Sequence, residues 1–154
     1  MKKVIAFLFL SLLLISSCVI GSIVQGFSLD PPLGLVGYQL SSNSIEIEWY
    51  GNNGESYFSG YVVFITTNSN DLYLNRDSTN HFDKPYLTNS SGGLPTVSAS
   101  ITTVTTKYSY EIKNLPNGSN LVVGVTYYIA VASYSSSKSV FSPLSNITNV
   151  TLTN

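Results

Sequence analysis

The sequence predicts an all-β fold, an antiparallel β-sandwich or barrel whose strands enclose one core. From Pro31 onward the apolar residues alternate with a period of two, and no window of eleven or more residues has the spacing of an amphipathic helix. Clusters of Gly, Asn, Ser and Pro separate the alternating runs. A chain of 154 residues fits one domain, and its 11 Tyr and 7 Phe are enough to fill a small β core.

The alternation is clearest in residues 44–50. Ile45, Ile47 and Trp49 point to one face of this predicted strand. The other face carries polar or amphipathic side chains, which are Ser44, Glu46, Glu48 and Tyr50. A strand with one face in the core and one in water has this pattern. Residues 51–54, Gly-Asn-Asn-Gly, are predicted to end it as a turn.

Four further segments combine β-branched and aromatic residues in short runs bounded by turn residues. They are residues 61–67, 108–112, 126–134 and 146–153. Residues 126–134 are the best candidate for a central strand because their apolar character is nearly continuous. Residues 115–118, Leu-Pro-Asn-Gly, are predicted to form a turn.

The first 17 residues have the organisation of a secretory signal peptide. Lys2 and Lys3 precede an apolar run over residues 4–15, and two small residues, Ser16 and Ser17, follow it. A bilayer-spanning helix needs about 20 apolar residues, so this run is short for one. Continuation through residues 19–24 would lengthen it, which leaves an uncleaved anchor helix as the alternative.

Ile15-Ser16-Ser17-Cys18 resembles the lipobox of bacterial lipoproteins, and Cys18 is the only cysteine of the chain. The resemblance implies a diacylglyceryl group on the Cys18 thiol, cleavage before this residue and a cell-envelope location. The next residue is Val19 and not Asp, so the resemblance allows an outer-membrane or surface location. Residues 18–30 would then be a tether. The alternative is an ordinary signal peptide followed by an unpaired cysteine.

Several motifs, taken in order, resemble the fibronectin type III domains of bacterial envelope and secreted proteins. The motifs are Pro31-Pro32 with Leu35, Ile45-x-Ile47-x-Trp49, Gly60-Tyr61-Val62-Val63-Phe64, Tyr127-x-Ile129-x-Val131 and Ser142-Pro143-x-Ser145. They resemble the first, second, third and sixth strands and the start of the seventh. The resemblance covers residues 31–154 and implies an immunoglobulin-like sandwich with Trp49, Tyr61 and Tyr127 in its core.

The resemblance also implies a tyrosine corner at Tyr127, in which the hydroxyl satisfies a nearby backbone group. Two alignments lead to this residue. One uses Leu121-x-x-Gly124-x-Thr126-Tyr127, and the other uses residues 115–118 with about six residues inserted before Tyr127.

The stretch of residues 68–106 is longer than the corresponding part of a fibronectin type III domain and is predicted to be a long mid-domain insertion. Within it we expect an edge strand at residues 71–75, a loop at residues 88–95 and a strand extension at residues 101–106.

The charge pattern argues against nucleic acid as a partner. The chain has 7 Lys and Arg against 8 Asp and Glu, and two of the lysines lie in the leader. The remaining five basic residues are scattered, whereas binding to phosphates needs clustered positive charge. They are Arg76, Lys84, Lys107, Lys113 and Lys138.

No residue pattern predicts catalysis, a metal or a cofactor. The only histidine is His81, and a Ser78–His81–Asp83 triad has no supporting motif. Asp71, Asp77 and Asp83 recur every six residues, which matches no calcium loop. Glu46 and Glu48 lie about 7 Å apart on the hydrated face of a strand, where we expect solvated charges.

Aromatic residues near turns are the candidates for binding, because exposed rings stack on sugars or fill partner pockets. They are Tyr57, Phe58, Tyr73, Phe82 and Tyr86. The alternative is that these rings cover edges of the sandwich itself. The sequence thus predicts a lipid-anchored, non-enzymatic envelope module that acts as a spacer, an adhesin-like domain or an assembly component. It leaves the ligand unknown, with a protein or a glycan as the partner. The alternatives are a carbohydrate- or small-ligand-binding module and, more remotely, a small hydrolase.

Overall fold

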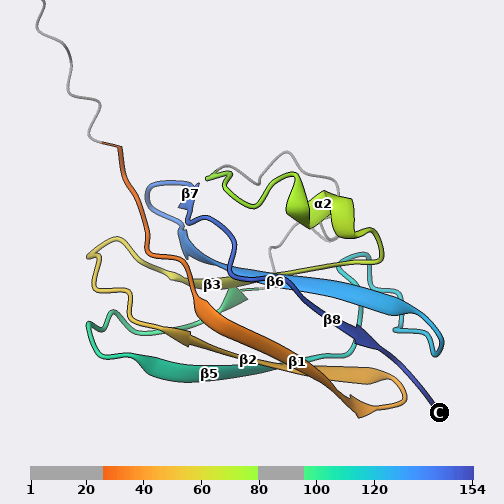
Figure 1. Cartoon of the computed structure of the whole chain (residues 1–154). Helices are drawn as coiled ribbons and strands as arrows, with labels where there is room; N and C mark the ends of the chain where they lie inside the picture. Colours follow the sequence, from red (N-terminus) through yellow and green to blue (C-terminus); the bar gives the residue numbers. More distant parts are fainter. Residues whose placement is uncertain (1–25, 80–95) are drawn as a thin grey trace, which may run out of the picture.

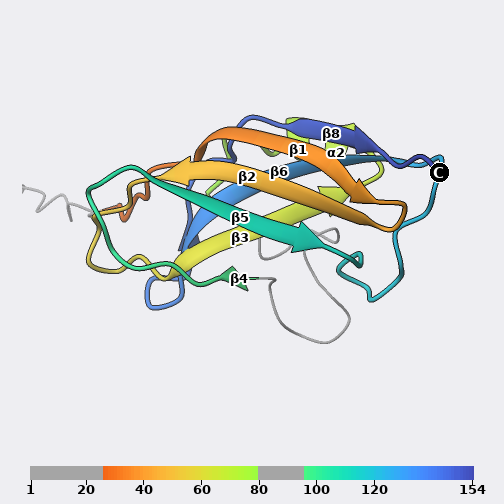
Figure 2. The same cartoon turned by 90° about the horizontal axis from the view of Figure 1, so that it is seen from below.

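The structure is a computed structural model that describes residues 26–79 and 96–154. Two antiparallel sheets lie face to face (Figures 1 and 2). One sheet has the order β1-β2-β5, formed by Leu33–Ser41, Ser44–Gly51 and Thr106–Ile112. The other has the order β4-β3-β6-β7, and β8 also pairs with β6. Its strands are Thr96–Val97, Gly60–Thr66, Thr126–Ser135, Val140–Phe141 and Thr148–Thr151.

The core between the sheets has the period-two arrangement predicted from sequence. Ile45, Ile47 and Trp49 of β2 are buried between the sheets. They face Tyr61, Val63 and Ile65 of β3, together with Tyr127, Ile129 and Val131 of β6. The prediction of an all-β, immunoglobulin-like sandwich is therefore confirmed.

Aromatic rings form the centre of this core. Trp49 meets Tyr61 edge-on, with 5.5 Å between ring centroids, and stacks on Tyr108 at 5.9 Å. Phe58 meets Tyr61 edge-on at 5.1 Å. Such pairs add to the free energy gained by burying the rings. The residues predicted for the core, Trp49, Tyr61 and Tyr127, are all buried.

The second sheet is covered on its outer face as well. A second cluster of buried side chains lies there, made of Val62, Phe64, Leu72, Ala130, Ala132, Phe141 and Leu144. Leu72 comes from a short helix, α2 (Ser69–Tyr73), which Figure 1 shows above β3 and β6. β3 and most of β6 are therefore buried on both faces, which agrees with the prediction of residues 126–134 as a central strand.

The edge strand predicted at residues 71–75 is wrong, because local hydrogen bonds favour helix α2. The Asn68 side chain caps the helix by accepting from the Asn70 N–H, and Asp71 lies in the first turn. Asn75 donates from its side chain to the Asp71 carbonyl oxygen at the other end. These polar side chains satisfy groups at both ends of the helix, while Leu72 packs into the cluster below.

Two other predicted boundaries also change. Residues 101–105 do not extend β5, because threonine hydroxyls bond locally there: Val104 N–H donates to Thr102 Oγ1, and Thr106 Oγ1 donates to the Val104 carbonyl. The last predicted strand, residues 146–153, is shortened to β8. The Asn146 side chain instead bonds to both backbone groups of Leu35 in β1, at 2.7 and 2.9 Å.

Tyr127 forms the tyrosine corner, and the corner selects one of the two alignments. Its hydroxyl accepts from the Val122 N–H, five residues earlier, at 2.8 Å. Leu121 beside it is buried, whereas Leu115 is only partly buried. The alignment through residues 121–127 is therefore the one that the structure supports.

The hydrogen bond between the Val122 N–H and the Tyr127 hydroxyl predicts the effect of Tyr127→Phe. This substitution removes the acceptor of that part-buried hydrogen bond, so the free energy of unfolding should fall by about 1 kcal/mol in urea denaturation. Tyr50→Phe alters an exposed tyrosine and should change it by less than about 0.5 kcal/mol. Equal losses of stability in Tyr127→Phe and Tyr50→Phe would contradict the hydrogen bond that forms the tyrosine corner.

The burial of Leu72 in the second cluster predicts that alanine substitutions at Leu72 and at Leu74 differ greatly in their effect on stability. Leu72→Ala should lower the free energy of unfolding by about 3 kcal/mol, because Leu72 is fully buried. Leu74→Ala should have almost no effect, since Leu74 is 83% exposed. Thermal or urea unfolding of both variants checks this. A small effect of Leu72→Ala would mean that helix α2 is not packed on the sheet.

Candidate functional site

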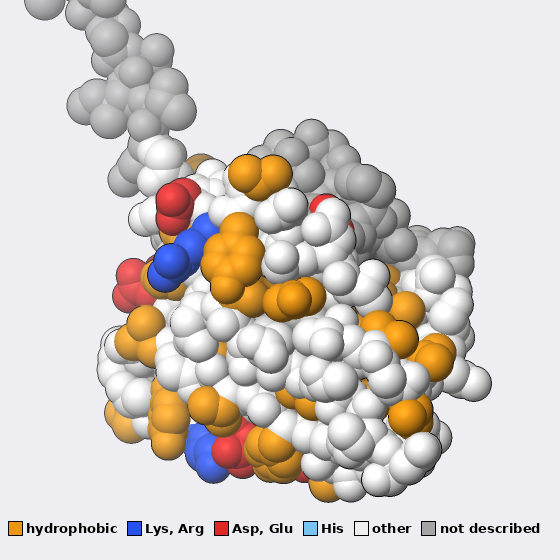
Figure 3. All heavy atoms as spheres, turned by 45° about the vertical axis from the view of Figure 1, so that its right-hand side comes forward, with side chains coloured by type: hydrophobic (Ala, Val, Ile, Leu, Met, Phe, Trp, Pro, Cys, Tyr) orange, Lys and Arg blue, Asp and Glu red, His pale blue; other side chains and the backbone are white. Residues whose placement is uncertain are grey.

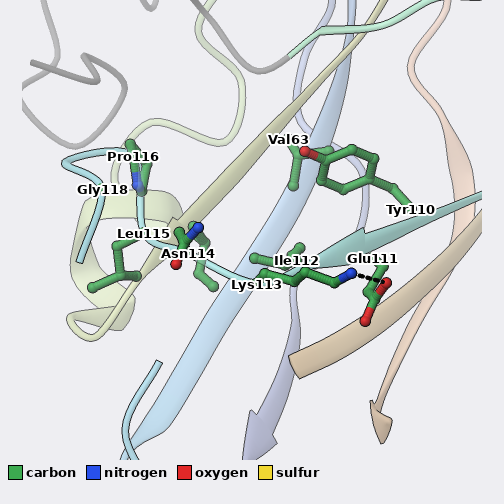
Figure 4. Close-up of a pocket in the computed structure, with 10 residues that line it drawn as sticks. Val63, Tyr110, Glu111, Ile112, Lys113, Asn114, Leu115, Pro116 and Gly118 are labelled. Atoms are coloured by element: carbon green, nitrogen blue, oxygen red, sulfur yellow. Dashed lines mark ion pairs between the residues drawn. The ribbon is translucent and has the colours of Figure 1, made fainter. Parts of the chain in front are cut away.

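The flank of the sandwich between β3 and β5 is the candidate site. Among the described residues, β5 pairs only with β2, and β4 covers only Tyr61 and Val62 of β3. A cleft of about 360 Å³ opens beside the uncovered part (Figure 4). This volume lies in the range of small-ligand pockets.

The cleft has a mixed lining of apolar side chains and polar groups, with a charged rim. Val63, Ile65, Ile112 and Leu115 supply apolar side chains, and the partly exposed Tyr110 also lines it.

At the rim, the Lys113 ammonium meets the Glu111 carboxylate at 2.9 Å (Figure 4). The hydrogen bond from Lys113 lowers the pKa of Glu111 below its usual range. The arrangement can accept apolar groups next to one ion pair, and none of the lining residues has the environment of a nucleophile or a general base.

The aromatic residues predicted for binding are not brought together. Phe58 is only 6% exposed and packs on Tyr61, so its prediction as a binding residue is corrected: its ring belongs to the core. Tyr57 is half-buried and donates its hydroxyl to the Ser28 carbonyl. Tyr73 is 57% exposed at the end of helix α2. Phe82, Tyr86, His81, Asp83 and Cys18 lie outside the described residues.

The predicted turn at residues 51–54 holds a buried polar centre. Asn53 is buried, and its Oδ1 accepts from the hydroxyl of Tyr61 at 3.0 Å and lies 3.0 Å from that of Ser133. Its Nδ2 donates to the Asp30 carbonyl at 3.0 Å. Burial, followed by the influence of Tyr108 and Glu55, raises the pKa of Tyr61 above its ordinary value. This centre is structural, because each of these polar groups already has a protein partner.

The segment assigned to the tether from sequence packs on the domain in its last four residues. Leu29 is buried in the main core, and Phe27 meets the Tyr57 ring edge-on at 5.3 Å. The Asp30 N–H donates to Glu55 Oε1 at 2.8 Å. In the described residues, packing on the domain therefore already includes Phe27, ahead of Pro31.

Acidic residues do not form a metal site in the described part of the chain. No group of three His, Cys, Asp or Glu side chains that could hold a metal ion occurs in residues 26–79 and 96–154. Asp71 accepts hydrogen bonds from Thr66 Oγ1 and Asn68 Nδ2. In the same residues, no helix is long and apolar enough to cross a membrane.

Sequence reasoning missed the cleft and the packing of Phe27. The alternation of Tyr108, Tyr110 and Ile112 shows which side chains face inward. It does not show which strand, among the described residues, pairs with each edge of β5, because strand pairing depends on residues far apart in the chain.

The buried Tyr61 phenol predicts a loss of stability at alkaline pH. Its pKa is raised in the folded state, so unfolding at a pH above about 10 releases a proton and becomes easier. The free energy of unfolding should therefore fall as the pH rises above about 10. Tyr61→Phe should flatten this decline in urea titrations, while Tyr73→Phe serves as an exposed control. An unchanged slope in Tyr61→Phe would contradict the burial of this phenol.

Comparisons with known proteins concern the fold alone. No protein-family model and no curated protein sequence matches the chain. Among solved structures, an Fn3-like protein from Clostridium thermocellum has 18% identity and a TM-score of 0.42 over 80% of this chain and 93% of its own. A structure described as a myokine has 14% identity and a TM-score of 0.45 over 82% and 100%. The strand order, the buried Trp49 and the tyrosine corner at Tyr127 are by themselves those of an immunoglobulin-like β-sandwich.

Proposed function

We propose that this chain is a non-enzymatic module of a bacterial cell envelope, held at a membrane by a lipid on Cys18. The observation that carries the proposal is the position of the single cysteine. Cys18 ends the lipobox-like run Ile15-Ser16-Ser17-Cys18, and only eight residues separate it from Phe27, which packs on the domain. Two acyl chains with a thioether-linked glycerol give stable membrane attachment.

The described surface supports binding or spacing as the role of the domain. The cleft beside β5 is lined by both apolar and polar groups, and its charged rim residues Lys113 and Glu111 are paired with each other. Such a site binds by shape, with apolar contact and a few polar groups that fix orientation. The sandwich itself is a rigid scaffold, because both faces of its second sheet are packed. A rigid, anchored scaffold is suited to present a binding surface at a fixed distance from a membrane.

Lipid attachment predicts the behaviour of Cys18→Ala. The full-length protein expressed in a bacterium should partition into the detergent phase of Triton X-114 and incorporate a labelled fatty acid. Cys18→Ala should lose the label, because the acyl acceptor is gone, and should no longer be cut before residue 18.

Ser17→Ala is the matched control, since a small residue remains at that position, and it should keep both properties. Fatty-acid labelling of Cys18→Ala equal to that of the wild type would overturn the proposal. An unlabelled, uncut wild-type protein in the detergent phase would instead support the anchor helix.

A further inference from the structure

Leu29 and Asp30, which lead into the domain, are held at one end of the sandwich. The backbone of Asp30 is held on both sides: its N–H donates to Glu55, and its carbonyl accepts from Asn53 Nδ2 at 3.0 Å and Ser133 Oγ at 2.6 Å. The preceding Leu29 is buried. The chain therefore enters the domain at a defined point, which Figure 1 shows at the end opposite the C-terminus.

The length of chain before that point limits how far this end can lie from a bilayer. Nine Cα–Cα steps join Cys18 to Phe27, and they span at most about 32 Å when fully extended. The opposite end lies roughly another strand length away, about 33 Å for the ten residues of β6. A lipid on Cys18 therefore keeps the entry end near the membrane.

Exposed apolar side chains lie at this same end. Asn53 links the Asp30 carbonyl to the loop of residues 98–105, because its own carbonyl accepts from the Thr102 N–H at 2.8 Å. In that loop Ile101 is 51% exposed and Val104 is 69% exposed. Phe27 is 44% exposed, and Lys138 Nζ lies 4.3 Å from its ring centroid. Figures 1 and 2 both place the loop at the end where the chain enters.

We propose that this end, formed by Phe27, Ile101, Val104 and Lys138, contacts the bilayer surface. The inference rests on the proposed lipidation of Cys18 and adds an orientation to it. Aliphatic and aromatic side chains partition into the interfacial region of a bilayer, and a lysine beside them keeps its ammonium among the headgroups.

Asp30 lies close by, and acidic and basic side chains both occur near the chain entry (Figure 3), so the contact is apolar and does not require anionic lipid. The turn at residues 115–118, part of the cleft, then points away from the membrane.

The test uses the mature, lipidated protein with a single added cysteine, because the Cys18 sulfur is then a thioether and does not react. Val104→Cys at the proposed contact and Asn117→Cys at the opposite end are labelled with an environment-sensitive fluorophore. Both are placed on vesicles of phosphatidylethanolamine and phosphatidylglycerol. At Val104→Cys we expect a blue shift of emission and a loss of intensity when the lipids carry a nitroxide on the acyl chain. At Asn117→Cys we expect neither change.

Co-sedimentation of the same samples separates the possible failures. Protein that sediments with vesicles while the Val104→Cys label stays in water would overturn the orientation and leave the lipid anchor standing. A Val104→Cys label shielded from water but not quenched by the nitroxide lipid would mean that another protein copy covers this end, which also overturns the proposal. A protein that carries no acyl chain and does not sediment would contradict both the orientation and the proposed function.

Discussion

Trp49 and Tyr61 meet edge-on between the two sheets, and the rest of the molecule is arranged around this contact. The Tyr61 ring lies against Gly51, where any larger side chain would overlap its hydroxyl. That hydroxyl donates to Asn53, and Asn53 in turn binds the Asp30 carbonyl. A continuous series of contacts therefore leads from the centre of the core to the segment that joins the domain to Cys18.

Much of the fold could be predicted because burial in a sheet has a period of two. Ile45, Ile47 and Trp49 are buried as predicted. Where prediction failed, local polar contacts or distant neighbours decided the outcome. Asn68 and Asn75 satisfy the ends of helix α2 in a segment that reads as a strand. The burial of Phe58 and the uncovered flank beside Ile112 depend on tertiary packing, which no local pattern in the sequence contains.

Helix α2 and the C-terminal segment cover surfaces of the sandwich that would otherwise be open to a partner. Leu72, Phe141 and Leu144 cover the outer face of the second sheet, so that face is used for stability. At the edge of the sandwich where β1 lies beside β8, the side chains of Gln39 and Asn146 join β1 to the C-terminal segment. Gln39 Nε2 donates to the Thr153 carbonyl at 2.8 Å. In the described residues, the flank between β3 and β5 is left with a cleft of mixed polar and apolar lining. If the chain-entry end lies at a membrane, the other end of this flank, with residues 115–118, faces away from it.

The burial of Trp49 can be measured directly, because it is the only tryptophan of the chain. Its Nε1 is buried and has no hydrogen-bond partner within residues 26–79 and 96–154, and the rings of Tyr61 and Tyr108 pack against the indole. The intrinsic fluorescence of the native protein should therefore be blue-shifted and resist quenching by acrylamide. It should shift to the red in urea together with the loss of β-sheet circular dichroism. Native emission typical of tryptophan in water, readily quenched by acrylamide, would contradict a core built on Trp49.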